Sequence, residues 1–375
     1  MNIARTQTIR HRQHIESLAQ QRGIGLAMEH VVLHSWLRCF EDHALDPAQR
    51  RKPQIVDAPE LRRRRSTADC TNTIARAEIL TLATTLDLSV GIVFTDVDGV
   101  ILQYAGAPAF AETARRSGFR DGAVWSESEQ GTNGMGTCLV VRKPVVIEQR
   151  QHFLAQNTAL SCFAAPVTNG SGELVGVLDI SCSNALPHAP MLAVLNLAVI
   201  NIENRLLWRQ GREHFALRFH RRPQDIGTAL EGVVMFDRGG IITGANRQAL
   251  RLLDAPSYAA VCGRRVESLL GIDMRHIDSL AANATLHCRP RMSVNDDKPG
   301  FGQIQPPAVW RARTQPNRTP ARDTLAMAER AALLEVLEHC EWNISDAARK
   351  LGLARKTLYR KMARHRLQRI VPATN

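Results

Sequence analysis

The stretch Asn343–Met362 decides the fold of the C-terminal part of the chain, and it reads NISDAARKLGLARKTLYRKM. Asn343 or Ser345 is suited to cap a helix over 344–351, because short polar side chains accept hydrogen bonds from the free amide groups of a first turn. Gly352 has the position of a glycine that ends a helix in the left-handed conformation. A second helix is expected over about 354–365, and the pair predicts a helix-turn-helix.

The second helix of this pair has one apolar side and one basic side. Leu358 and Met362 are four residues apart and should face the neighbouring helices. Between residues 349 and 369 there are nine Lys and Arg and no acidic residue. A solvated basic helix is the alternative interpretation, but charge, glycine turn and amphipathic pattern together favour a helix that enters the major groove of double-stranded DNA. The candidate DNA-binding residues are Arg355, Lys356, Thr357, Tyr359, Arg360, Lys361 and Arg364.

A further amphipathic helix is expected just before this pair. Its apolar positions are Leu325, Ala328, Ala332, Leu333, Val336 and Leu337. We therefore expect an all-α DNA-binding domain over 323–375.

Composition agrees with a polyanionic partner. The 375 residues carry a net charge of +12, and only six of the 48 cations are Lys. A soluble protein this basic is typical of nucleic-acid binding. Hydrophobic residues make up 44% of the chain, which suffices for several buried cores.

Several classes of protein are disfavoured. The longest apolar stretch, Met191–Ile202, is well short of the ~20 residues that span a bilayer, and no signal peptide is recognisable, so we expect a cytoplasmic protein without a membrane partner. The eight cysteines include no C-x-x-C pair, so neither a metal site nor a disulfide framework is expected. No Gly-Lys dipeptide occurs, and a P-loop is therefore absent from this sequence. No cofactor and no enzymatic activity are expected.

The N-terminal part divides into a helical region over 1–71 and an α/β domain over 72–220. The run RRRR at 62–65 is expected to be a solvated helix face or linker, with a nucleic-acid patch as the alternative. Asp-Gly within 96–99 and Asn-Gly-Ser-Gly at 169–172 each separate two apolar runs, which predicts two hairpins. Between them, Trp125–Thr137 is expected to be a polar, glycine-rich loop.

The domain should end in an exit helix from Pro190 to about His220. Its stripe Leu192, Leu195, Val199, Ile202 and Leu206 has two interpretations: packing on its own sheet, or a two-chain coil that makes a homodimer. The periodicity runs past the expected edge of the sheet and therefore favours the coil.

A second hairpin unit is expected over 221–287. Its sequence GVVMFDRGGIITGANRQALRLL at Gly232–Leu253 repeats the pattern of VGIVFTDVDGVIL at Val90–Leu102. From 288 to 322, six prolines and few large apolar residues predict a flexible linker.

Several of these strings resemble one family. Residues Asn343–Met362 closely resemble the Fis-type helix-turn-helix of sigma-54-dependent activators, and the N-terminal half is similar to their acetoin-catabolism-regulator (AcoR) branch. The matching strings are SWLRC at 35–39, LDP at 45–47, WSESEQGTNGMGT at 125–137, PVVIEQRQHF at 144–153, NTALSCFAAPV at 157–167 and GELVGVLDIS at 172–181.

The resemblance implies a multidomain α+β protein, with a GAF-type α/β sensor over 72–220, a PAS-like α+β unit over 221–287 and the Fis-type helical domain. The family's central AAA+ ATPase domain has no counterpart between sensor and helix-turn-helix, where the chain has only the expected linker. Ala354 stands where the family usually has Ser, and Phe163 replaces a usual Ser.

A GAF sensor implies a small organic effector, and the residues placed to line its pocket are Trp125, Glu127, Thr132, Asn133 and Cys138. Glu127 has two possible roles: accepting a ligand hydroxyl, or capping the glycine-rich loop. Cys162 and Asp179 are expected to be structural.

The sequence therefore predicts an effector-responsive, homodimeric DNA-binding transcriptional regulator without ATPase activity. The alternative is an interaction protein that modulates or competes with a full-length sigma-54-dependent activator, with that activator or RNA polymerase as its partner.

Overall fold

The computed structural model describes residues 11, 13, 15, 17, 30–86, 89–183, 187–274, 277, 286–291, 299–307, 333, 336–337, 340 and 342–365. The chain divides into two compact units, Met1–Val309 and Trp310–Asn375.

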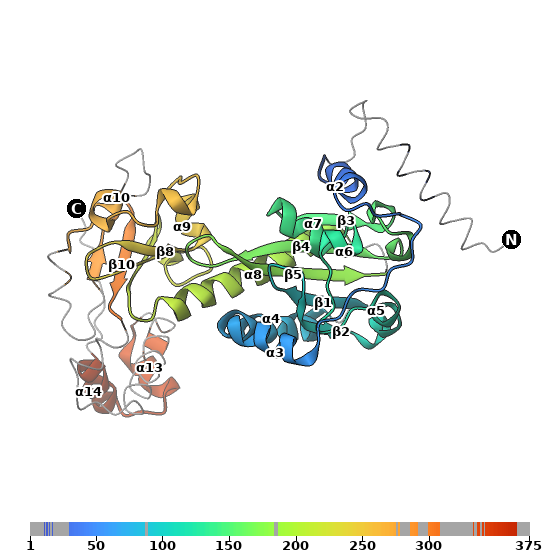
Figure 1. Cartoon of the computed structure of the whole chain (residues 1–375). Helices are drawn as coiled ribbons and strands as arrows, with labels where there is room; N and C mark the ends of the chain where they lie inside the picture. The colour runs from blue at the N-terminus through green and yellow to red at the C-terminus, as the bar shows by residue number, and fades with distance from the viewer. Residues whose placement is uncertain are drawn as a thin grey trace. The chain divides into compact units, whose positions relative to one another are not determined.

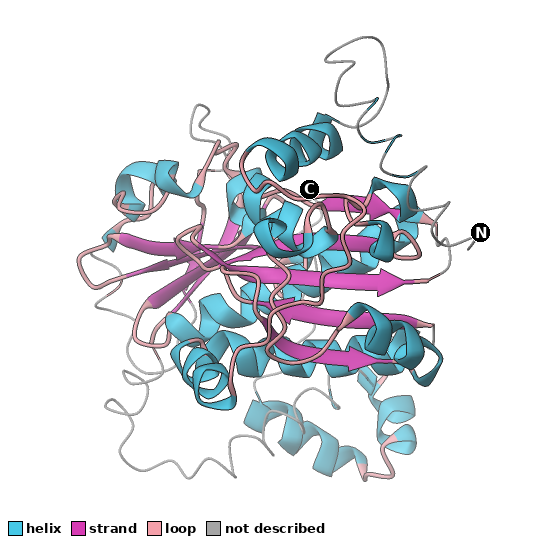
Figure 2. Cartoon of the chain, turned by 45° about the vertical axis from the view of Figure 1, so that its right-hand side comes forward, coloured by secondary structure: helices cyan, strands magenta, loops and turns pink. Residues whose placement is uncertain are grey.

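The first unit contains two antiparallel five-stranded sheets (Figures 1 and 2). The first sheet has the order β2-β1-β5-β4-β3, and its strands are β1 (Val90–Thr95), β2 (Ile101–Gly106), β3 (Val145–Glu148), β4 (Ser161–Thr168) and β5 (Leu174–Cys182). All residues of β1 are buried. A strand buried on both faces requires helices on both sides of its sheet, which is the arrangement in Figure 1.

One face of this sheet packs on long helices. They are α3 (Ala58–Thr67), α4 (Asp69–Leu86) and α8 (His188–Gln210). Ile92 and Phe94 of β1 pack with Leu195 and Ile202 of α8 in one buried cluster. α8 is long and apolar enough to pass for a membrane span by length and composition, but its buried residues pack on the sheet, as expected of a core helix.

The opposite face carries α2 (His30–Glu41), α5 (Ala111–Ser117), α6 (Glu127–Gln130) and α7 (Gly134–Val141). Trp36 of α2 and Met135 of α7 are buried in a second cluster with Val93 of β1. The described part of the region 1–71 thus packs against the first sheet.

The predicted hairpins are confirmed, and their turns share one design. Asp96 Oδ1 accepts the amide of Val100 at 2.9 Å, and Asp237 Oδ1 accepts the amide of Ile241 at the same distance. Gly99 has φ of +81°, a conformation that side chains rarely adopt. The repeated sequence pattern therefore corresponds to a repeated strand–turn–strand geometry.

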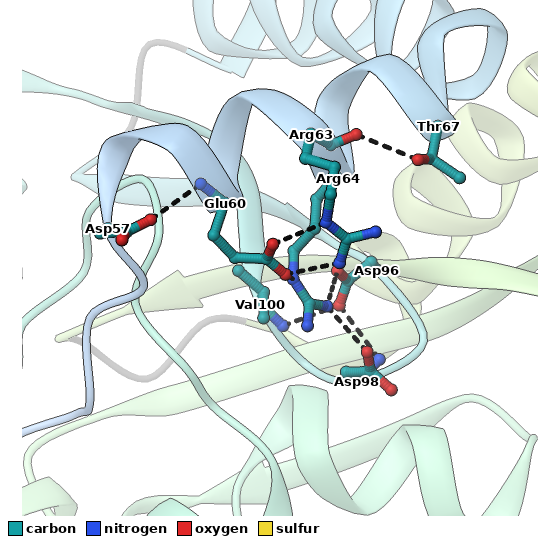
Figure 3. Close-up of polar contacts among 8 residues, drawn as sticks. All are labelled: Asp57, Glu60, Arg63, Arg64, Thr67, Asp96, Asp98 and Val100. Carbon is teal, nitrogen blue, oxygen red and sulfur yellow. Dashed lines mark hydrogen bonds and ion pairs between the residues drawn. The ribbon is translucent and has the colours of Figure 1, made fainter.

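The arginine run at 62–65 lies on α3 and holds the first hairpin turn in place (Figure 3). Arg64 Nη1 donates to Asp96 Oδ2 and Asp98 Oδ2, both at 2.7 Å, and Arg64 Nε donates to Glu60 at 2.7 Å. Arg65 bonds the carbonyl of Leu102 at 2.9 Å through Nε. Because these guanidinium groups are used inside the unit, the solvated or nucleic-acid interpretations of this run do not describe Arg64 and Arg65.

The second sheet has the order β8-β7-β6-β10-β9. Its strands are β6 (Phe215–His220), β7 (Gly232–Phe236), β8 (Ile242–Ala245), β9 (Leu286–Cys288) and β10 (Phe301–Gln305), with α9 (Arg247–Leu252) and α10 (Val266–Leu270) beside them. β6 pairs with β7 on one side and β10 on the other.

This sheet corrects two expectations. The exit helix ends at Gln210 rather than near His220, because Phe215–His220 form the central strand β6. The expected flexible linker over 288–322 is wrong in its first part, because Phe301–Gln305 pair with β6 over five residues. Residues 292–298 and 308–322 of this interval lie outside the described residues.

A buried ion pair joins the two sheets. Glu203 of α8, whose side chain is 6% exposed, accepts from Arg247 Nε at 2.5 Å and from Arg247 Nη2 at 2.6 Å. The same carboxylate accepts from the amide and the hydroxyl of Thr168, both at 2.8 Å. Arg247 Nη2 also donates to the carbonyl of Pro166 at 2.9 Å. The end of β4, α8 and α9 therefore meet at one charged contact.

The second unit is helical in its described residues. It contains α13 (Ile344–Lys350) and α14 (Arg355–His365). Leu333 and Leu337 lie in one buried cluster with Ala347, Ala348 and Leu358. The positions Leu325, Ala328 and Ala332 of the expected preceding helix lie outside the described residues.

Candidate functional site

Local interactions set the start of α13, the turn between the two helices and the start of α14. Asn343 Oδ1 accepts from the amides of Ser345 at 3.1 Å and Asp346 at 3.4 Å, so Asn343 is the cap. Gly352 has φ of +63° and joins the two helices. The carbonyl of Ala354 accepts from the amides of Thr357 and Leu358, so α14 starts there without a side-chain cap.

The predicted DNA-binding residues occupy the outer side of α14. Leu358 is fully buried, whereas Arg355, Lys356 and Arg360 are exposed and Tyr359 is 57% exposed. Thr357 and Lys361 are half-buried. Arg364 is within the helix, and its side chain is not among those described. The helix thus turns an apolar side inward and presents cations outward, as a groove-reading helix requires.

In the first unit, the segment 125–137 is not the polar, glycine-rich loop that the sequence predicted. The segment contains α6 and the start of α7, and its residues Glu127, Gln130, Thr132 and Asn133 are buried. Asn133 caps α7 by accepting the amide of Gly136 at 2.9 Å.

Glu127 is held by α2. Its Oε1 accepts from Arg38 Nε at 2.6 Å, and its Oε2 accepts from Arg38 Nη2 at 3.0 Å and from the Ser35 hydroxyl at 2.6 Å. The bond to Glu127 raises the pKa of Arg38. Ser35 also lies 2.7 Å from the Thr132 hydroxyl. In this structure the Glu127 carboxylate bonds α2, a contact that neither sequence-derived role included.

Ser35 and Arg38 were not among the predicted site residues. They lie within the string SWLRC, but 92 and 89 residues separate them from Glu127. The one sequence signal for this contact is that the strings SWLRC and WSESEQGTNGMGT occur in the same chain. That their side chains pair is seen only in the folded structure.

Trp125 and Cys138 are both fully buried. The Trp125 ring stacks on Phe119 with centroids 4.4 Å apart. The Cys138 thiol donates to the carbonyl of Lys143 at 3.3 Å, and burial raises its pKa. All five predicted effector residues are therefore in the interior beneath α2, α6 and α7 or within those helices.

Several buried polar atoms of the first unit have no hydrogen-bond partner among the residues that the structure describes. They include Trp125 Nε1, both amide atoms of Gln130, both amide atoms of Asn157, and Asp179 Oδ2. Buried polar groups are normally paired. Gln130 and Asn157 were not among the residues that the sequence indicated.

A buried polar chain crosses β4 and β5. Cys162 Sγ lies 3.3 Å from His152 Nε2 and 3.1 Å from the Ser181 hydroxyl, which donates to Asp179 Oδ1 at 2.6 Å. Burial raises the pKa of Asp179 to about 7 and that of Cys162 well above its usual value, so this thiol is not a ready nucleophile. Burial also lowers the pKa of His152 to about 4.

The two shifts act oppositely on stability. The raised pKa of Asp179 means that the folded state holds the proton longer, so its contribution to stability is lost as pH rises from about 4 to about 7. The lowered pKa of His152 means that the unfolded state takes the proton first, so stability is lost as pH falls from about 6.5 to about 4.

Comparison with known proteins agrees with the geometry of both units. Residues 324–365 match the family model described as bacterial regulatory protein, Fis family, which confirms the predicted helix-turn-helix. Residues 5–204 match the model described as MimR, N-terminal domain. Since the second match covers more than half of the chain, the chain belongs to the MimR N-terminal domain family.

Similar proteins are transcriptional regulators. The chain is 28% identical over 347 residues to the acetoin catabolism regulatory protein of Cupriavidus necator, covering 87% of this chain and 51% of that protein. It is 29% identical over 194 residues to the acetoin dehydrogenase operon transcriptional activator AcoR of Bacillus subtilis, covering 51% and 32%. The predicted AcoR-type relationship is thereby confirmed.

Coverage of these relatives is partial. The chain spans about half the length of the first and about a third of the second. Among solved structures, the chain is similar to the E. coli DhaR(N)–DhaL complex at 16% identity and a TM-score of 0.45, covering 74% of this chain and 99% of that one.

Proposed function

We propose that this chain is a transcriptional regulator that binds double-stranded DNA through α14. The observation that carries the proposal is the exposed basic side of α14 in a segment that matches the Fis family. Arg355 and Arg360 are exposed, and neither forms an ion pair with a carboxylate among the described residues. Arginines near the start of such a helix are suited to base edges, and those further along to phosphates.

The first unit acts as the sensor in this proposal. Its first sheet with α2–α8 is the GAF-type domain and its second sheet the PAS-like unit, and the protein works in the cytoplasm. A small organic effector binds beneath α2, among Trp125, Glu127, Thr132, Asn133 and Cys138. The unpartnered atoms of Trp125, Gln130 and Asn157 supply hydrogen-bonding capacity for it.

α2 controls access to that site. Arg38 and Ser35 bond Glu127, and Trp36 Nε1 donates to the carbonyl of Gln151 at 2.8 Å. An effector that takes over the Glu127 carboxylate must compete with these bonds. The free energy of effector binding therefore differs between the state in which α2 is bonded to Glu127 and the state in which α2 is released. Such a difference is required if effector binding is to be coupled to DNA binding.

The active form is a homodimer, but not through the predicted coil. Leu195, Ile202 and Leu206 are fully buried on the sheet of their own chain, so that seam is wrong and the alternative, packing on the sheet, describes α8. The outer side of the helical layer is available instead: Leu80 of α4 is 53% exposed and Leu197 of α8 is 57% exposed. Two copies that bury this layer would be held by apolar contact.

ATP hydrolysis is not part of the proposal. The printed sequence contains no P-loop motif between sensor and helix-turn-helix. This same observation favours the second candidate function, in which the chain modulates or competes with a full-length sigma-54-dependent activator or contacts RNA polymerase.

DNA binding is tested with the full chain and labelled duplexes from the promoter region upstream of its own gene, measured by fluorescence anisotropy. Arg355→Ala and Arg360→Ala should each weaken binding by about 1–3 kcal/mol, as expected for loss of a bidentate base contact. Arg150→Ala, which removes an exposed arginine of the first unit, is the matched control.

Unchanged affinity in both α14 variants contradicts the assignment of DNA binding to this helix. The second candidate is distinguished by adding the full-length relative. If the chain alone does not bind the duplex but lowers the relative's occupancy, the chain acts as a competitor or modulator.

A further inference from the structure

A cavity opens on the first unit, and none of the five residues assigned to the effector lines it. Its volume is about 560 Å³. One wall is the segment 51–55, which follows α2, and the other is α5 with the residues after it, 117–120. We call this space the basic cavity. Its size lies within the ~300–1,000 Å³ of small-molecule sites.

The lining of the basic cavity carries one sign of charge. Five of its residues are cations, namely Arg51, Lys52, Arg115, Arg116 and Arg120, and no carboxylate is among the lining residues. A concave surface lined by one sign of charge concentrates small ions of the other sign.

Nearby carboxylates neutralise only part of this charge. Arg115 and Arg116 share Glu112, at 2.6 and 2.7 Å. Arg51 pairs with Glu129 at 3.2 Å. Within the described chain, no carboxylate pairs with Lys52 or Arg120. The five cations thus pair with only two carboxylates, so the net charge around the cavity is positive.

The inner surface of the cavity is apolar. Ala114, Phe119 and Pro53 are buried and line it, and Tyr104 of β2 contributes its half-buried ring. An inorganic ion would leave this surface uncovered and most of the volume unfilled. A ligand with an apolar body and one anionic group fits both properties.

We propose that the basic cavity binds a small organic carboxylate, with the carboxylate among the cations and the apolar body against Phe119 and Pro53. Arginine forks are suited to carboxylates because they donate two parallel hydrogen bonds. Phe119 also stacks on Trp125, so a ligand here contacts a side chain that packs directly against the interior of the sensor.

The proposal is tested by isothermal titration calorimetry on the full chain. Benzoate is the probe, benzyl alcohol is its uncharged analogue, and inorganic phosphate is the anion without an apolar body. Benzoate should bind at least about tenfold more tightly than either, since it alone engages both parts of the site.

Two variants separate this cavity from other sites. Lys52→Ala combined with Arg120→Ala removes the two unpaired cations, and Ala111→Trp fills the cavity without changing its charge, because Ala111 lines it and is exposed. Each should weaken benzoate binding about tenfold or more. Arg150→Ala is the control and should leave binding unchanged, with circular dichroism confirming that every variant folds.

Three results would overturn the proposal. One is the absence of benzoate binding at millimolar concentration, and another is equal binding of benzoate and benzyl alcohol. The third is benzoate binding that survives in both the double variant and the cavity-filling variant, which would place it elsewhere on the protein.

Discussion

Replacing Arg247 by Ala should destabilise the first unit, because the Glu203 carboxylate then loses its ion-pair partner. Glu203 would keep its charge at 6% exposure, with only the two bonds from Thr168 left of the four that it accepts. Leaving one partner of a buried pair uncompensated costs about 3–5 kcal/mol. Two unit charges ~4 Å apart at an effective dielectric constant of ~20 interact by ~4 kcal/mol, which agrees with that range.

The pair is measured with a double-mutant cycle. Glu203→Gln keeps the shape of the side chain and removes its charge, and should cost about 1–3 kcal/mol. The double variant should cost less than the sum of the two single changes, because Arg247→Ala no longer strands a carboxylate when Glu203 is Gln.

The assay is urea denaturation of the full chain followed by far-ultraviolet circular dichroism, with Arg251→Ala as the matched control on α9. Arg251 is exposed and bonds only Gln248 among the interactions described for it. If Arg247→Ala costs less than about 1 kcal/mol, or if the two single changes add without coupling, then the ion pair does not join the sheets energetically.

Three further outcomes are expected. Leu197→Arg should yield a folded monomer by analytical ultracentrifugation, because it places a charge on the proposed dimer surface. Ile202→Lys should unfold the first unit, because it buries a charge in the core. A folded monomer from Ile202→Lys would contradict the packing of α8 on the sheet. Asp179→Asn should make stability rise with pH between about 4 and 6.5 in denaturation measurements. The variant lacks the carboxyl group whose raised pKa lowers stability over this range, so the effect of His152 is no longer offset. An unaltered pH profile would refute the raised pKa of Asp179 and the lowered pKa of His152. Gly352→Ala should cost about 1 kcal/mol in the second unit, because its φ is +63°, and an unchanged melting temperature would argue against that turn.

Short-range patterns predicted those parts of the molecule whose partners are close in sequence. The turns at Asp96 and Asp237 and the cap at Asn343 depend on contacts within four residues. The helix-turn-helix was recognisable because its cap, glycine and apolar spacing all fall within the twenty residues Asn343–Met362.

Contacts between residues far apart in the sequence could not be predicted from such short-range patterns. The strand at Phe301–Gln305 is short, precedes two prolines and pairs with β6, so its local sequence resembles a linker. The stripe on α8 has the same period whether it faces a sheet or another helix, and only the presence of β1 and β5 decides between them.

The candidate effector site was predicted in part. The polar residues of 125–137 were singled out, but their burial was not, because glycine and serine content indicates an exposed loop. The cover supplied by α2 through Arg38 and Ser35 depends on a contact across about ninety residues, which periodicity does not reveal.

The strand order of the second sheet has a consequence for the chain as it leaves the ribosome. β6 lies in the middle of this sheet but is made early, and its neighbour β10 follows only at Phe301–Gln305. At ~5–20 residues per second, one edge of β6 stays unpaired for roughly 4–17 s while the intervening segment is translated. β6 reads FALRFH, with four of its six residues buried in the finished fold. An apolar strand edge that stays unpaired for this time can form hydrogen bonds with other nascent chains. The yield of native protein should therefore depend on the translation speed between residues 221 and 305. It should also depend on chaperones that cover this strand.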